Sequence, residues 1–159
     1  MGSSRMSLES IDFQSLIHQY VTGFIESWKA LGWSEEEIQE NASNFFQLGM
    51  IAADQIQKEE GIQPQGSDQV IPYTEDMAKK VIHTFLLGLN EGAKKGYDMK
   101  LPSKEKWLLL QNVALHVFEQ SKQVTVATLG QENTPEVQIS EQQIQEFVGN
   151  TAVEGLIYY

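Results

Sequence analysis

The chain has 159 residues, a formal net charge of −11, no cysteine and 41% hydrophobic residues. This length favours one domain with a single core, and the negative charge argues against duplex DNA, RNA or an anionic membrane as the main partner, because these need a basic surface. The lack of cysteine excludes a disulfide scaffold, an iron–sulfur cluster, a zinc finger and a cysteine nucleophile.

The sequence has an atypical first segment and no run typical of a membrane span. Residues 1–5 have the composition of a vector-derived remnant, so we expect residues 6–159 to form a single helical domain. No basic segment precedes an apolar run near the start, which argues against a signal peptide. The longest apolar-rich run, over 107–118, is interrupted by polar residues and is too short to cross a bilayer. We therefore expect a cytoplasmic protein without membrane insertion.

A first helix is predicted from Phe13 to about Leu31. Apolar residues recur there every three or four positions, which is the spacing of one helical face, and polar residues lie opposite. Ser10 is a candidate N-cap, because a serine side chain can accept a hydrogen bond from an unpaired backbone N–H. Gly32 is typical of the residue that ends a helix, since glycine adopts the left-handed conformation without steric cost.

The second helix has the clearest start signal in the chain. The run from Ser34 to Glu37 is a capping box, in which a serine is followed three residues later by a glutamate. Helical spacing continues to about Glu60, and Gly61 is expected to end the helix. The following stretch, 61–73, contains two prolines and two glycines, and we predict a loop that crosses the end of a helical bundle.

Two further helices follow this loop. Thr74, with acidic residues directly after it, is the predicted N-cap of a third helix that ends at Gly96. Ser103 follows a proline and is the predicted cap of a fourth helix, which includes Trp107 and Phe118. Both helices show apolar residues every three or four positions, so we expect them to pack into the same core.

The segment 123–139 is ambiguous between two structures. Its first part, QVTVATLG, can continue the fourth helix as far as Gly130, which matches the length of the second helix. The same residues can form a strand that pairs with EVQI in a short β-hairpin, because β-branched residues favour strands. We expect the helix, since an isolated hairpin is stable only when it packs on the bundle, and we keep the hairpin as the alternative.

A fifth helix is predicted after Ser140. The run from Ser140 to Gln143 is a second capping box, and apolar residues at helical spacing follow as far as Leu156. Five helices with short capped turns and one longer loop indicate an all-α fold, an antiparallel bundle of about five helices.

Glycines at 88, 92 and 96 follow one another at four-residue spacing in the predicted third helix. Each helical glycine costs roughly 1 kcal/mol relative to alanine, so Gly88 and Gly92, beside the apolar face, need a compensating contact. We expect a close-packing notch that includes Gly49 of the second helix as a matching small residue, with large neighbours such as Phe45. A notch for a planar ligand and a flexible hinge are the alternatives, and Gly96 is interpreted as the end of the helix.

Leucines also occur on the polar side of the predicted fourth helix. Leu108 and Leu115 are seven residues apart, hence on one line, and polar residues surround them. Either another helix of the bundle covers this line, or the line is an exposed seam for a partner. Val153 and Ile157 lie similarly off the main apolar face of the fifth helix. We therefore predict an interaction seam of these four residues, which can also join two copies of the chain.

No recognisable catalytic, metal or cofactor motif occurs in the sequence. The Glu-x-x-His pattern of di-iron bundles is absent, as are the zinc-protease, EF-hand, P-loop and dinucleotide motifs. His18, His83 and His116 fall at polar or boundary positions, and we interpret them as ordinary surface or boundary residues. The acidic residues lie mainly at helix starts and on polar faces, where capping and solvation account for them. We expect no catalytic residue, no metal and no cofactor.

These observations predict a non-enzymatic helical interaction protein: an adaptor, assembly factor or regulator that uses apolar helix seams and an acidic surface. Lysines cluster between 79 and 106, whereas none follows Lys122, so the acidic C-terminal part is a candidate contact surface. The expected partner is a protein, with a homodimer as one option. The alternative is a carrier or sensor of a small ligand or pigment, with a cavity lined by Trp28, Phe45, Phe85 and Trp107.

Overall fold

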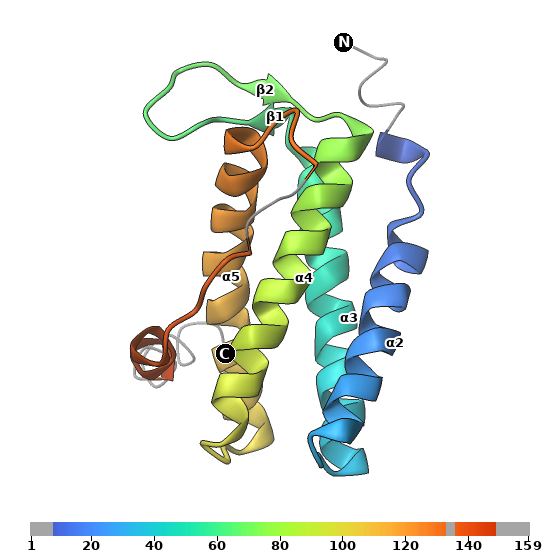
Figure 1. Ribbon diagram of the computed structural model, residues 1–159, viewed down its shortest axis with the longest axis vertical. Coiled ribbons are helices and arrows are strands. Elements are labelled where there is room, and N and C mark those ends of the chain that lie inside the picture. The colour runs from blue at the N-terminus through green and yellow to red at the C-terminus, as the bar shows by residue number, and fades with distance from the viewer. Residues whose placement is uncertain (1–7, 133–135, 149–159) are drawn as a thin grey trace.

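The computed structural model describes residues 8–132 and 136–148 (Figure 1). Long helices run alternately up and down in this part of the chain: α2 (Phe13–Ala30), α3 (Glu35–Lys58), α4 (Glu75–Tyr97) and α5 (Ser103–Ala127). Two short antiparallel strands lie between α3 and α4, namely β1 (Gly61–Ile62) and β2 (Ile71–Pro72), and a further helical segment occupies 141–148. The predicted all-α antiparallel bundle is therefore confirmed. Residues 1–5, interpreted as a vector-derived remnant, lie outside the described residues.

Several predicted helix starts have the expected capping hydrogen bonds. The side-chain oxygens of Ser34, Thr74 and Ser140 accept from the backbone N–H three residues on, at distances of 3.2, 3.1 and 3.1 Å. Gln143 Oε1 also accepts from the backbone N–H of Ser140 at 2.9 Å, which completes that capping box. These bonds satisfy backbone groups that a helix leaves unpaired, so the local sequence sets where these helices begin.

Two other predicted caps are wrong. Asp12 caps α2 in place of Ser10: its Oδ1 atom accepts from the backbone N–H of Ser15 at 3.0 Å, because Asp12 directly precedes the first helical residue. Ser103 is the first residue of α5, and its hydroxyl donates to Glu40 Oε2 at 3.0 Å. The preceding proline occupies the N-cap position in an extended backbone conformation, so the helix can begin at the next residue.

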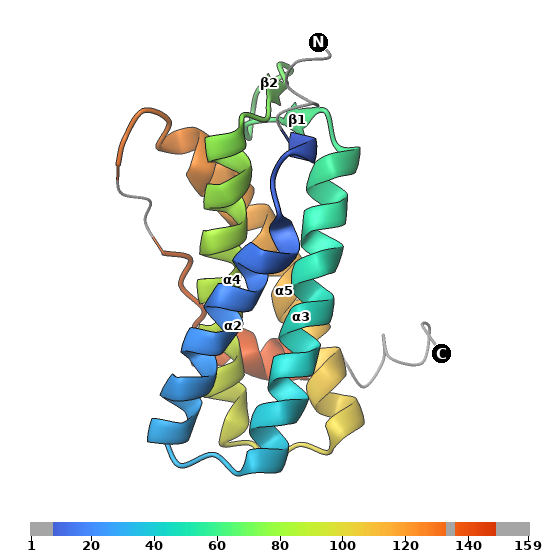
Figure 2. The ribbon, with the colours of Figure 1, turned by 90° about the vertical axis from the view of Figure 1, so that its right-hand side faces the viewer.

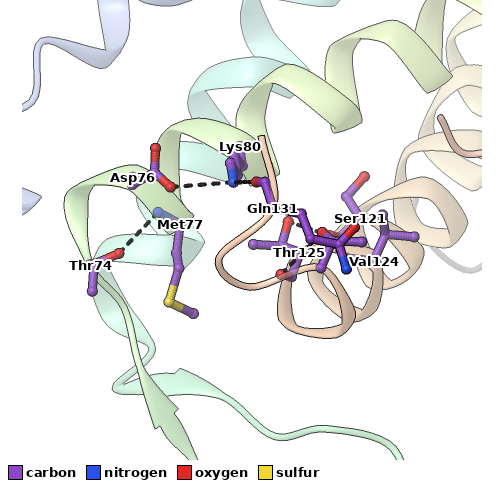
Figure 3. A network of polar contacts seen from close by, with 9 residues as sticks. Thr74, Asp76, Met77, Lys80, Ser121, Val124, Thr125 and Gln131 are labelled. Carbon is purple, nitrogen blue, oxygen red and sulfur yellow. Dashed lines mark hydrogen bonds and ion pairs between the residues drawn. The ribbon is translucent and has the colours of Figure 1, made fainter. Parts of the chain in front are cut away.

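The segment 123–139 begins as a helix, because α5 continues through its first residues. A short hairpin exists in the described part of the chain, but it is β1–β2 and not 123–139. Packing outweighs the strand preference of the β-branched residues: Thr125 is fully buried, and its hydroxyl donates to Ser121 O at 2.8 Å (Figure 3). Beyond α5 the chain returns to α4, where Lys80 Nζ donates to Gln131 O at 2.9 Å (Figure 3).

The loop between α3 and α4 crosses one end of the bundle, as predicted (Figure 1). It buries Ile62 and Tyr73, and Gln123 of α5 holds it through hydrogen bonds with two backbone groups, at 3.0 and 2.9 Å. Gly61 does not end the helix, because α3 ends at Lys58. Instead Gly61 permits the strand pairing, since a Cβ atom there would lie 2.1 Å from the carbonyl oxygen of the paired strand.

The glycines of α4 face α5. A Cβ atom added to any of them would clash with an α5 side chain: Gly88 with Val117 and Gly92 with Val113, each at 2.6 Å, and Gly96 with Leu109 at 2.8 Å. Gly96 therefore belongs to the same contact as the other two glycines. It does not end the helix, because α4 continues to Tyr97.

Gly49 belongs to a different contact. A Cβ atom added there would lie 3.0 Å from Ile17 Cγ2 of α2, so Gly49 is not the matching partner of the α4 glycines. The large neighbours of Gly88 and Gly92 are valines of α5 and not Phe45. The glycines let α5 pack more extensively on α4 than on α3. α2 packs on the side of the α3–α4 pair opposite α5 (Figure 2).

Gly88→Ala should lower the free energy of unfolding by roughly 1–3 kcal/mol, because the new methyl group overlaps Val117, a stiff β-branched side chain. Gly23, in α2, is the matched control, since a Cβ atom added there meets open space. Gly23→Ala should instead raise the free energy of unfolding by about 0.5–1 kcal/mol. Urea unfolding followed by circular dichroism measures both changes. Equal effects at the two positions would contradict the close α4–α5 contact.

Candidate functional site

An apolar groove of about 510 Å³ lies between α3 and α5. Its apolar lining comes from three helices: Leu48, Ile51 and Ala52 of α3, Phe85 of α4, and Leu108, Ala114, Leu115 and Phe118 of α5. The groove occupies the side of the bundle where α5 packs less extensively, so it follows from the close contact of α5 with α4.

The two rims of the groove expose apolar side chains. Ile51 on α3 is 60% exposed and Leu115 on α5 is 68% exposed. Leu108 is only 9% exposed, so the bundle covers the first residue of the predicted seam and leaves the second open. Fully burying a leucine or isoleucine side chain contributes about 1.5–3 kcal/mol of favourable free energy. Binding of a molecule that covers this pair is therefore favoured. Val153 and Ile157, the other predicted seam residues, lie outside the described residues.

Uncharged amides border the apolar floor. Gln55 of α3 and Gln111 and Asn112 of α5 line the groove together with one carboxylate, that of Glu119. This carboxylate is paired with Lys122, at 3.1 Å between Oε1 and Nζ. The groove therefore has a nearly neutral border, although the whole chain carries a net charge of −11.

The helical segment 141–148 lies against α5 beside the groove (Figure 1). Asn112, which lines the groove, donates from Nδ2 to Phe147 O at 3.4 Å. The rings of His116 and Phe147 lie 5.7 Å apart, and Gln143 Nε2 lies 3.4 Å from His116 Nε2. The sequence did not predict this contact, because periodicity within one helix does not say which helices meet. The available signal was the pair Asn112 and His116, which lie four residues apart on one helical face.

A buried ion-pair cluster lies next to the groove, at the hairpin end of the bundle. Lys122 Nζ lies 3.0 Å from Glu59 Oε2, and 4.8 Å from the centre of the Phe118 ring. Tyr73 OH donates to the other carboxylate oxygen of Glu59 at 3.1 Å. Burial, and then the Glu59 carboxylate, raise the pKa of Tyr73 well above its usual range, so the phenol stays protonated and donates. The cluster thus ties α3, the hairpin and α5 together.

The structure separates the four aromatic residues considered for a ligand cavity. Trp28 and Phe45 are fully buried and pack edge to face, with ring centres 5.1 Å apart. The indole N–H of Trp28 donates to Asn90 Oδ1 at 2.8 Å. Phe85 lines the groove, whereas Trp107 is half-buried and is not one of its lining residues. The four rings therefore do not line the groove together.

Candidate catalytic groups are dispersed. His83 Nδ1 is hydrogen-bonded to Tyr20 OH at 2.5 Å, and burial lowers the pKa of His83 against an opposing effect of Glu136. Ser121 Oγ is buried and has no hydrogen-bond partner among the described residues, so no base is placed to activate it. The described residues also contain no group of three or more histidine, aspartate or glutamate side chains that could hold a metal ion.

Comparison of the chain with known protein families, curated proteins and solved structures gives no match. Within 8–132 and 136–148, no helix is both long enough and apolar enough to cross a bilayer. Among the described residues, the groove with its exposed apolar rims and nearly neutral border is the best candidate for a binding site.

Lys122→Met should lower the free energy of unfolding by about 3 kcal/mol, because it leaves the Glu59 carboxylate without its cation while the unbranched side chain still fills the space. Lys58→Met is the matched control. The Lys58–Asp54 pair is equally short, at 2.8 Å, but exposed, so its loss should change stability by less than about 0.5 kcal/mol. Urea unfolding measures both. Similar losses for the two variants would show that burial does not strengthen the Lys122 pair.

The half-buried His83 should make stability depend on pH below its ordinary pKa of about 6.5. Because the folded pKa is lowered, the unfolded chain takes up the proton first as the pH falls. The neutral form of His83 contributes fully to the free energy of unfolding above about pH 6.5. This contribution is lost as the pH falls towards the pKa of His83 in the folded protein.

We therefore expect the free energy of unfolding to fall more between about pH 7 and about pH 5.5 for the native chain than for His83→Gln, because glutamine does not titrate and keeps a polar group near Tyr20. Urea titrations at the two pH values measure the difference. An equal fall in both proteins would show that this histidine does not contribute.

Proposed function

We propose that the protein is a non-enzymatic interaction protein that binds an apolar helical segment of a partner protein in the α3–α5 groove. The observation that carries this proposal is the pair of exposed side chains, Ile51 and Leu115, on the rims of a groove with an apolar floor. Exposed apolar surface rimmed by polar residues is typical of binding sites. A helix that enters such a groove presents apolar residues at positions i, i+3, i+4 and i+7.

The dimensions of the groove favour a short helical motif. On α5 the lining runs from Leu108 to Glu119, which corresponds to about 16 Å at a helical rise of 1.5 Å per residue. On α3 it runs from Leu48 to Gln55, or about 10 Å. Two to three turns of a helix fit this length, at 5.4 Å per turn. Such a helix carries about three apolar residues on one face, which is enough to cover both exposed rims.

The charge of the molecule bears on the choice of partner. A net charge of −11 repels strongly acidic proteins at long range, whereas the neutral amides at the groove favour neither sign at close range. A neutral or basic segment therefore approaches most readily, and a second copy of the chain must overcome repulsion. We place this adaptor, assembly or regulatory activity in the cytoplasm, since the cysteine-free composition suits a reducing compartment.

A small apolar ligand is the second candidate occupant. The volume of about 510 Å³ lies within the range of about 300–1,000 Å³ that is typical of ligand sites. This form of the carrier hypothesis retains Phe85 from the predicted aromatic cavity and adds Phe118 and Leu115. Native mass spectrometry of the purified chain distinguishes it, because a retained ligand adds a defined mass.

Leu115→Lys should reduce capture of the partner at least tenfold, since a partner that covers the groove must then desolvate an ammonium group. Leu31→Lys is the matched control, because Leu31 is 57% exposed, lies at the C-cap of α2 and does not line the groove. Each tagged chain serves as bait in a lysate of the native host, and captured proteins are quantified by mass spectrometry. Circular dichroism melts check that both variants remain folded.

A partner that is held by the native chain and by Leu31→Lys, but lost from Leu115→Lys, supports the groove as the binding site. Equal capture by all three proteins contradicts it. Light scattering of the same proteins over a concentration series tests the homodimer, whose mass should return to that of one chain in Leu115→Lys.

A further inference from the structure

The apolar groove continues into a second hollow at the hairpin end of the bundle. This hollow, here called the hairpin pocket, has a volume of about 610 Å³ and lies between the end of α3, β1 with the loop that follows it, and the C-terminal half of α5. Glu119 lines both the groove and the hairpin pocket, so one elongated molecule can contact the two. Their joint lining extends along α5 from Leu108 to Gln123, or about 23 Å at 1.5 Å per residue.

Charge distinguishes the hairpin pocket from the groove. Three carboxylates line the pocket, those of Glu59, Glu60 and Glu119, together with a single ammonium group, that of Lys122. Within the described part of the chain, Glu119 is the one charged lining residue of the groove, and it lies at the hairpin end of the α5 lining. The C-terminus of α3 adds negative potential, because Glu59 and Glu60 directly follow its last residue. The joint site is therefore apolar over most of its length and negative at one end.

The carboxylates of the hairpin pocket have capacity for a second cation. Lys122 Nζ lies 3.0 Å from one oxygen of Glu59 and 3.1 Å from one oxygen of Glu119, whose side chain is 66% exposed. Glu60 is exposed, and its side chain has no hydrogen bond or ion pair with any residue of 8–132 and 136–148. Lys58, the last residue of α3, is paired with a carboxylate of its own helix and does not line the pocket. The pocket thus has an excess of negative charge that a partner can neutralise.

We infer that the groove recognises an amphipathic helix with an arginine at the end that reaches the hairpin pocket. The inference rests on the proposed function of the groove, and it deepens that function by naming the chemistry of the partner segment and the end that lies at the hairpin. The apolar face of this helix covers Ile51 and Leu115, and its guanidinium group binds the carboxylates of Glu60 and Glu119. Arginine suits this position better than lysine, because its planar group donates to two oxygen atoms at once.

The lining of α5 sets the spacing between the apolar residues and the arginine. Glu119 follows Leu115 by one helical turn, or about 6 Å, and the pocket lining continues for another turn to Gln123. We therefore expect the arginine about four to eight positions from the partner residue that covers Leu115. Lys122 shows that a cation is accommodated next to the apolar floor: its Nζ atom lies 4.8 Å from the centre of the Phe118 ring, and Phe118 lines the groove.

A peptide library tests this pattern without knowledge of the natural partner. Alanine-rich helices of about 16 residues with varied positions are displayed on phage and selected on the full-length chain, because shorter isolated helices are marginal in water. Parallel selection on Leu115→Lys identifies the peptides that need the groove. Relative to the starting library, we expect these peptides to be enriched in arginine at one end, about four to eight positions from an apolar i, i+3, i+4 pattern.

A selected peptide is then synthesised with arginine and with citrulline, which keeps the shape of the side chain without its charge. Fluorescence anisotropy gives the dissociation constants of both peptides. Citrulline should weaken binding to the native chain about tenfold, because charge-assisted hydrogen bonds are lost. It should change binding to Glu60→Gln combined with Glu119→Gln by less than about twofold. The matched control, Glu26→Gln combined with Glu35→Gln, removes the same charge from exposed residues outside the groove and the pocket, and should keep the tenfold effect.

The outcomes separate this inference from the proposed function. If peptides need Leu115 but citrulline has equal effects on the native chain and on the Glu60/Glu119 variant, the groove remains a binding site and the arginine contact is overturned. If peptides need the two carboxylates but bind Leu115→Lys unchanged, the pocket acts without the groove, which overturns the inference. If no selected peptide depends on Leu115, the proposed function itself is contradicted. Circular dichroism melts check that each variant is folded.

Discussion

The close approach of α5 to α4 is the contact on which the shape of this molecule depends. Gly88 and Gly92 lack the side chains that would separate the two helices, and Val117 and Val113 fill the space that this leaves. Each helical glycine costs roughly 1 kcal/mol, whereas burying a valine side chain stabilises by about 1.5–3 kcal/mol, so the contact is favourable. Because α5 packs mainly on α4, it meets α3 less extensively, and the groove opens on that side.

The hairpin end of the bundle fixes the upper part of α5 in this position. Lys122 pairs with Glu59 at the end of α3, and Tyr73 beside the hairpin completes the hydrogen bonding of that carboxylate. The ammonium group of Lys122 can remain charged in the low-dielectric interior because the Glu59 carboxylate lies within ion-pair distance. The glycine contact and this cluster therefore act at different heights of α5, and together they hold its groove-facing side at a fixed distance from α3.

The groove combines exposed apolar rims with a nearly neutral border, although the protein is acidic. Its rims expose Ile51 and Leu115, and its border is formed mainly by uncharged amides. Several titratable groups lie in caps, in surface ion pairs and in the buried cluster at the hairpin. We propose on the basis of the exposed rims that the groove recognises an apolar segment.

The sequence by itself determined the features that depend on neighbours within one helical turn. The caps at Ser34, Thr74 and Ser140 could be predicted because each hydrogen bond joins residues three positions apart. The all-α class followed from apolar spacing, and the need for a close contact at Gly88 followed from the cost of helical glycine.

Only the tertiary structure decided which surfaces meet. It paired Gly88 with Val117 and Gly49 with Ile17, and it kept the start of 123–139 helical, with Thr125 buried in the bundle. It also covered Leu108 while it left Leu115 open, although the two residues lie on one line of the same helix. These outcomes depend on the distances between helices that are far apart in the sequence, and periodicity within one helix contains no information about those distances.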